Sequence, residues 1–126
     1  MREAIHGEKP VGLPFSAGVR GPGVIYLSGQ VAQDPATGRL IEGDVAAQTA
    51  RTLENVRALL QSIGASLDDV LRVGVFLTSM ESFGAMNEVY ARFFRAPYPA
   101  RTTVAVRELP LGAAVEIEMI VADRRA

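Results

Sequence analysis

Two stretches near the carboxyl end of the chain alternate apolar and polar residues with a period of two. This pattern predicts β-strands over residues 99–107 and 114–121, with a break over 109–112 between them. In the second strand, one face is entirely apolar, whereas Glu116 and Glu118 lie on the other face. Because two acids are costly to bury unless they are paired, they restrict what this strand can contact.

Arg101 and Arg107 of the preceding strand are the expected partners of these acids. Spacing alone leaves two interpretations of Arg101 open. In the first, Arg101 forms a structural ion pair with Glu116 or Glu118. In the second, its planar guanidinium binds the carboxylate of a ligand through two parallel hydrogen bonds. We therefore expect the functional site near this arrangement of charges.

Composition restricts the classes of function. The 126 residues predict one domain over 1–126, and 48% hydrophobic with 21% charged residues is typical of a globular protein. A net charge of -1 without a block of like charge argues against nucleic acid or a membrane as partner.

The chain has no cysteine, which excludes thiolate chemistry, and His6, the one histidine, cannot make a metal site alone. The amino end lacks the apolar segment of a secretory signal, so we expect a cytoplasmic protein.

Two helices follow from periodicity and capping residues. Asp44 is a good N-cap, apolar residues then recur at helical spacing, and Gly64 provides a left-handed C-terminal cap. A second helix begins after Thr78, which matches a capping box with Glu81, or after Ser79. Its apolar stripe consists of Phe83, Met86, Tyr90 and Phe93, with Asn87 beside it.

The order of elements predicts an α+β fold. Besides the last two strands, we expect strands over 3–5, 15–20, 24–30 and 70–77, with a tight turn over 21–23. Two helices then cover one face of a mixed β-sheet. Several strands are apolar on both sides, so we expect a second subunit to cover the other face.

The last two strands resemble the signature of the RidA (YjgF) family, the imine/enamine deaminases. The resemblance extends through the Ser-Gly-Gln end of the strand over 24–30 and both helices, and it covers nearly the whole chain without large gaps. The signature residues are Pro99-Ala100-Arg101, Val104, Val106, Leu109-Pro110 and Val115-Glu116-Ile117-Glu118.

The resemblance implies a chorismate-mutase-like domain that forms a homotrimer with a central β-barrel and active sites between subunits. It implies hydrolysis of reactive 2-imino and 2-enamino acids to 2-keto acids and ammonia. The expected substrates include 2-aminoacrylate, 2-iminopropanoate and 2-iminobutanoate. Neither a metal nor an organic cofactor is implied, and the expected partners are the small-molecule acid and further copies of the chain.

Within this resemblance, Arg101 binds the substrate carboxylate, and the backbone near Thr103 helps to place the amino group. Glu118 is the catalytic acid that orients or deprotonates water, or protonates the enamine. The alternative for Glu118 is a buried acid satisfied by an arginine or a backbone amide. Glu116 and Arg107 are interpreted as framework.

Three further residues belong to the implied cleft. Ser28 and Asn87 match residues that hydrogen-bond substrate. The alternatives are turn chemistry for Ser28 and a helix-surface or intersubunit hydrogen bond for Asn87. Many family members have a tyrosine where this chain has Phe15, and the loss of its hydroxyl affects substrate choice or activity.

Other functions stay open beside this one. One alternative is a deaminase for a bulkier intermediate of the aminomuconate type. Another is a ligand-binding or regulatory trimer without turnover. Endoribonuclease or translation-inhibitor activity is least favoured, because the net charge is near neutral and no histidine acid-base pair is evident.

Overall fold

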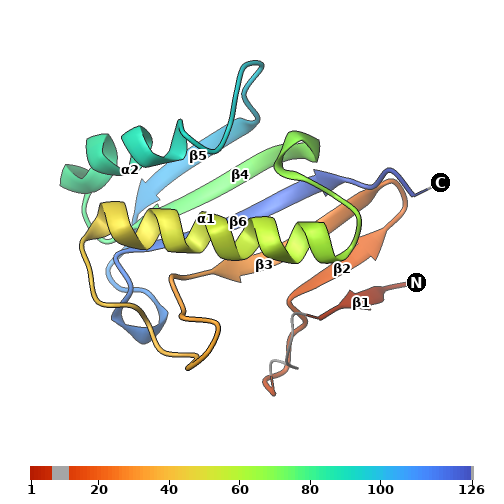
Figure 1. Cartoon of the computed structure of the whole chain (residues 1–126), viewed down its shortest axis with the longest axis horizontal. Helices are drawn as coiled ribbons and strands as arrows, with labels where there is room; N and C mark the ends of the chain where they lie inside the picture. The colour runs from red at the N-terminus through yellow and green to blue at the C-terminus, as the bar shows by residue number, and fades with distance from the viewer. Residues whose placement is uncertain (7–11, 126) are drawn as a thin grey trace.

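The computed structural model describes residues 1–6 and 12–125, which form one β-sheet with two α-helices on the same side (Figure 1). The six strands lie in the order β1-β2-β3-β6-β4-β5. Neighbours are antiparallel except β4 and β5, which are parallel and are joined through α2. The predicted α+β fold, with two helices on one face of a mixed sheet, is therefore confirmed. The elements are β1 Glu3–Ile5, β2 Gly18–Gly21, β3 Val24–Gln30, α1 Val45–Ser62, β4 Val70–Leu77, α2 Phe83–Tyr90, β5 Ala100–Ala105 and β6 Val115–Ala122.

Helix α1 begins and ends at the predicted residues. The side chain of Asp44 accepts a hydrogen bond from the backbone N–H three residues later, at 2.9 Å. Gly64 has a φ of 79°, a left-handed conformation that glycine adopts without steric cost. Its N–H donates to the carbonyl of Gln61, and the N–H of Ala65 donates to that of Leu60. These two bonds form a Schellman motif, which satisfies carbonyls at the helix end.

The hydrophobic core lies between the helices and one face of the sheet. Alternate residues of β6 are almost fully buried on this face, as the period-two pattern predicts. Helix α1 packs lengthwise over the sheet, and α2 lies beside it (Figure 1). The core residues of these three elements are Val115, Ile117, Met119 and Val121 from β6, Leu53, Val56 and Leu60 from α1, and Met86 and Tyr90 from α2.

Three local predictions need correction or restriction. The strand predicted over 15–20 begins at Gly18, because the backbone before it turns and the N–H of Phe15 donates to a carbonyl two residues earlier. Ser79 rather than Thr78 caps the entry to α2, where a single 3-10 turn precedes the helix. The segment over 9–14, whose prolines and glycine predict a turn-rich loop, falls partly outside the described residues.

The face of the sheet away from the helices exposes apolar side chains. Tyr26 is 48% exposed and Val104 is 41% exposed, while Phe76 and Ile120 are half-buried. A second subunit over this face stays a prediction. None of the described helices combines the length and the apolar character needed to cross a membrane.

Candidate active site

Arg101 and the two acids of β6 lie on opposite faces of the sheet. Arg101 pairs with Val73 in the parallel ladder, and Val73 is buried on the helix side. Glu118 pairs with Gly74, whose face is the open one. Since register partners share a face, one chain does not bring Arg101 and Glu118 together. A site that contains both residues requires a second copy of the chain.

The ion pairs expected between the acids and the arginines of the preceding strand do not form. Among residues 1–6 and 12–125, neither Glu116 nor Glu118 forms an ion pair with Arg101 or Arg107. The reason is the strand order, because β4 lies between β5 and β6 and separates their side chains. That prediction is wrong within one chain.

Two aromatic rings surround Arg101 instead. Its guanidinium carbon lies 4.7 Å from the ring centroid of Tyr90 and 5.6 Å from that of Phe83. Both rings belong to α2, where they are seven residues apart and so share one stripe of the helix. Asn87 lies between them on the same stripe. The positive charge of Arg101 therefore faces π-electrons rather than a carboxylate.

Buried polar atoms without partners accompany Arg101. The Oδ1 of Asn87 and the hydroxyl oxygens of Tyr90 and Thr103 are buried, and none of the described protein groups is hydrogen-bonded to them. Thr103 lies two residues after Arg101 and faces the same side of β5. Burial raises the pKa of Tyr90 above its ordinary value, and the positive charge of Arg101 partly opposes this rise. The phenol is therefore neutral near pH 7. The groups of Asn87 and Thr103, beside a cation without a carboxylate partner among the described residues, are typical of a site for a polar ligand.

Glu116 and Glu118 lie against glycines of different strands. A Cβ atom at Gly29 would lie 2.6 Å from a carboxylate oxygen of Glu116, and one at Gly74 would lie 2.9 Å from the Cγ of Glu118. Glu116 therefore leans toward β3, and Glu118 leans toward β4. Burial raises the pKa of Glu116 above its ordinary value, and the negative charge of Glu118 adds to the rise.

Ser28 and Phe15 lie at the same turn before β2 but differ in their contacts. The Ser28 hydroxyl donates to the carbonyl of Ser16 at 2.6 Å, so in this structure it supports the turn before β2. Ser28 directly precedes Gly29, on which Glu116 rests. Phe15 is 52% exposed, and its ring is available to a second chain or a ligand.

Sequence reasoning missed the contact of Arg101 with Tyr90 and Phe83. The helical spacing places both rings on the apolar stripe of α2 and gives no sign that this stripe meets a cation. The interpretation of Glu116 as framework stays a prediction, and in the structure this acid lies beside Gly29. Within the described part of the chain, no group of three or more potential ligands could hold a metal ion.

Comparisons with known proteins agree over almost the full length. The sequence profile of the family described as endoribonuclease L-PSP matches residues 7–123. The chain is 38% identical over 113 residues to the 2-iminobutanoate/2-iminopropanoate deaminase of Dermatophagoides farinae, covering 90% of this chain and 88% of that protein. RidA from the Antarctic bacterium Psychrobacter superposes with a TM-score of 0.90 at 38% identity, covering 97% and 100% of the two chains. TdcF of E. coli, solved with bound serine, gives a TM-score of 0.87 at 35% identity, covering 96% and 98%.

Proposed function

Because the chain belongs to the RidA (endoribonuclease L-PSP) family, we propose that it hydrolyses reactive 2-imino and 2-enamino acids to 2-keto acids and ammonia. The observation that carries the proposal is the environment of Arg101. This guanidinium has no carboxylate partner in the described chain and lies beside buried polar atoms that lack partners. A small acid with a nitrogen at the second carbon fits both features.

Arg101 supplies the recognition of the carboxylate. Its planar fork donates two parallel hydrogen bonds to the two carboxylate oxygens, which fixes the plane of the substrate. Asn87 and the backbone near Thr103 then lie close to the substrate nitrogen. The serine bound to TdcF is likewise a small amino acid with a carboxylate.

A carboxylic acid supplies the proton transfers. An enamine first takes a proton from the acid at its third carbon and becomes the iminium ion. Water then adds to the second carbon and returns a proton to the acid, which leaves a neutral adduct with a hydroxyl and an amino group. The hydroxyl proton passes to the nitrogen, the carbon–nitrogen bond breaks, and the keto group forms as ammonia leaves, so the net reaction consumes one water.

Two observations support Glu116 in this role in preference to Glu118, the acid favoured by the sequence. Burial raises the pKa of Glu116, which keeps part of this side chain protonated at higher pH, as a proton donor requires. Glu116 also lies against Gly29, next to Ser28. Glu118 is more exposed and lies over Gly74.

The proposed active site spans two copies of the chain in a homotrimer. Arg101 of one copy lies on the helix side of edge strand β5, whereas the acids lie on the open face of the sheet. The free edge of one chain therefore has to approach the open face of the next. The exposed Tyr26 and Val104 on that face support such an association.

The test generates 2-aminoacrylate from serine with a pyridoxal-phosphate-dependent dehydratase and measures keto-acid release with and without the protein. We expect release to accelerate, and Arg101→Ala to remove the acceleration. Arg107→Ala is the matched control, because Arg107 is exposed and lies beyond the end of β5. No acceleration by the wild-type protein would refute the deaminase proposal.

A mixing experiment tests whether the site is shared between chains. Arg101→Ala and Glu116→Gln are each expected to be inactive alone. After unfolding and refolding together, mixed trimers contain interfaces with Arg101 from one chain and Glu116 from the other, so part of the activity returns. A site within one chain would give no recovery. If Glu118→Gln, and not Glu116→Gln, abolishes activity, then Glu118 is the acid.

A further inference from the structure

Arg101 is held in a way that is unusual for an arginine that binds a ligand. A free arginine side chain samples many rotamers, and ordering it on binding lowers affinity. Ligand-binding arginines are commonly oriented by a neighbouring carboxylate, but none pairs with Arg101 in the described chain. Such a carboxylate would also compete with the acidic substrate for the guanidinium.

The two rings of α2 orient Arg101 in place of a carboxylate, and they carry no net charge. Tyr90 lies 4.7 Å and Phe83 5.6 Å from the guanidinium carbon, both within the range of cation–π attraction. Tyr90 is buried, whereas Phe83 is 37% exposed, so Tyr90 provides the closer and the less solvated contact. These contacts act on the charge of the guanidinium and involve no carboxylate, so they leave N–H groups available to donate to a ligand.

A second aromatic contact fixes the position of the Tyr90 ring. Its ring stacks on Phe94 with a centroid separation of 4.6 Å and an interplanar angle of 29°. The Tyr90 hydroxyl has no full hydrogen bond among the described residues, and the polar group that acts on it is the guanidinium of Arg101 itself. The stack on Phe94 is the contact that fixes the ring. The ring is therefore a fixed platform, and the flexible arginine adapts to it.

We propose that Tyr90, assisted by Phe83, is a positioning residue that pre-orients Arg101 for the substrate carboxylate through the faces of the rings. This inference rests on the proposed function, since it assigns Arg101 to a carboxylate ligand. It predicts that the aromatic ring matters and that the hydroxyl does not take part in proton transfer. The raised pKa of the Tyr90 hydroxyl is consistent with a neutral phenol.

The test compares Tyr90→Leu, which removes the ring, with Tyr90→Phe, which retains it. In the dehydratase-coupled assay we expect Tyr90→Leu to raise KM about tenfold with kcat changed less than about threefold. Tyr90→Phe should restore KM to within about threefold of the wild type and keep its pH profile. Phe83→Leu, at the more exposed ring, should raise KM about threefold. Phe94→Leu is the packing control, because it weakens the support of the Tyr90 ring but leaves both rings at Arg101, so it should raise KM by less than Tyr90→Leu does.

A second readout needs no substrate. The Nε–Hε signal of Arg101 in heteronuclear NMR should show a rigid side chain with ring-current shifts in the wild type and Tyr90→Phe, and a mobile one in Tyr90→Leu. If the wild type neither turns over nor binds a 2-keto acid, the proposed function fails, and this readout still decides whether the rings hold Arg101. If Arg101 is equally rigid in Tyr90→Leu, or if Phe94→Leu changes KM as much as Tyr90→Leu does, the inference is wrong.

Discussion

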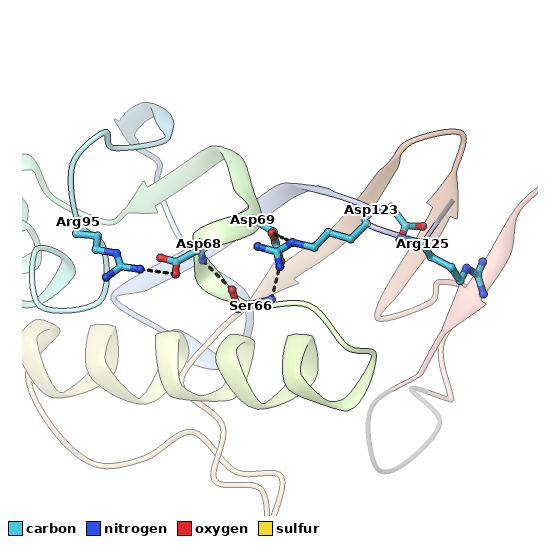
Figure 2. Close-up of polar contacts among 7 residues, drawn as sticks. Ser66, Asp68, Asp69, Arg95, Asp123 and Arg125 are labelled. Atoms are coloured by element: carbon cyan, nitrogen blue, oxygen red, sulfur yellow. Dashed lines mark hydrogen bonds and ion pairs between the residues drawn. The ribbon is translucent and has the colours of Figure 1, made fainter.

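Two arginine environments of this protein contrast. Around the turn that precedes β4, Arg95 and Arg124 are each matched to an aspartate, and Figure 2 shows this cluster with Arg95, Asp68 and Asp69 labelled. The Nε of Arg124 donates to buried Asp69 at 2.6 Å, and Arg95 pairs with Asp68 at 2.8 Å. Arg101 on β5 has aromatic rings in place of an acid. The first environment uses arginine to fasten segments of chain, and the second leaves its hydrogen-bond donors free.

The difference lies in whether a protein carboxylate neutralises the charge of the arginine. Asp69 accepts from the backbone N–H of Ser66 as well as from Arg124, so its carboxylate is saturated by the protein itself. Such a pair has nothing left to offer a ligand. A cation that the protein leaves unpaired retains its affinity for an external anion. The comparison therefore separates the acid-paired arginines around this turn from Arg101, which has no carboxylate partner among the described residues.

Removing the two kinds of arginine gives the largest contrast. Arg101→Ala is expected to lower kcat/KM by about a hundredfold, since a bidentate charge-assisted contact is lost, with little change in stability. Arg124→Ala is expected to leave kcat/KM within about twofold. The coupled assay and urea unfolding at a fixed protein concentration measure the two effects. Equal losses of activity in both variants would break the distinction.

The acid partner of Arg124 gives the next largest effect. Asp69→Ala removes both the cap on the 3-10 turn over 67–69 and the ion pair, so we expect the free energy of unfolding to fall by about 2–3 kcal/mol. Asp68→Ala is the matched control, because its pair with Arg95 is exposed and contributes less than about 1 kcal/mol. Urea unfolding measures both, and a larger effect at Asp68 would contradict the comparison.

Most of the fold was predictable because its signals are local. The cap residues of α1 and the period-two pattern of β6 lie within the elements that they define, and both predictions are confirmed. The entry to α2 was ambiguous because Thr78 and Ser79 are adjacent and both can cap a helix. Only the packed structure selects Ser79. The start of β2 likewise depends on a turn that no periodicity describes.

The site was less predictable because strand order is not local. Nothing in the sequence says that β4 separates β5 from β6, and this order decides that Arg101 does not pair with Glu118. The stripe on α2 carried a usable signal, since Phe83, Asn87 and Tyr90 recur at intervals of four and three. Such spacing identifies one face of a helix, but it cannot tell whether that face meets apolar core or a cation.

Acid titration tests the same contrast at Glu116, which has no cationic partner among residues 1–6 and 12–125. Its pKa is raised in the folded state, so the folded protein holds this proton more tightly than the unfolded chain does. Stability therefore falls as the pH rises from the ordinary value of 4.5 through the raised pKa. Glu116→Gln should remove this loss and stabilise the protein at pH 7 by up to about 1 kcal/mol, discounted for solvent screening. Urea unfolding across this pH range measures the difference. A variant that is less stable than the wild type at pH 7 would indicate an unrecognised partner for Glu116.

The pair of Glu3 and Arg125 should show the opposite sign and the smallest effect. The guanidinium of Arg125 donates to both carboxylate oxygens of Glu3, at 3.1 and 2.6 Å, and this hydrogen bonding lowers the pKa of Glu3. The stabilisation is present above the unfolded pKa of Glu3 and is lost as the pH falls through the lowered one. Because both side chains are exposed, salt should screen the contribution, and Arg125→Ala should differ from the wild type only at low ionic strength. A difference that persists in 1 M salt would show that the pair fastens β1 to the chain end by packing as well as by charge.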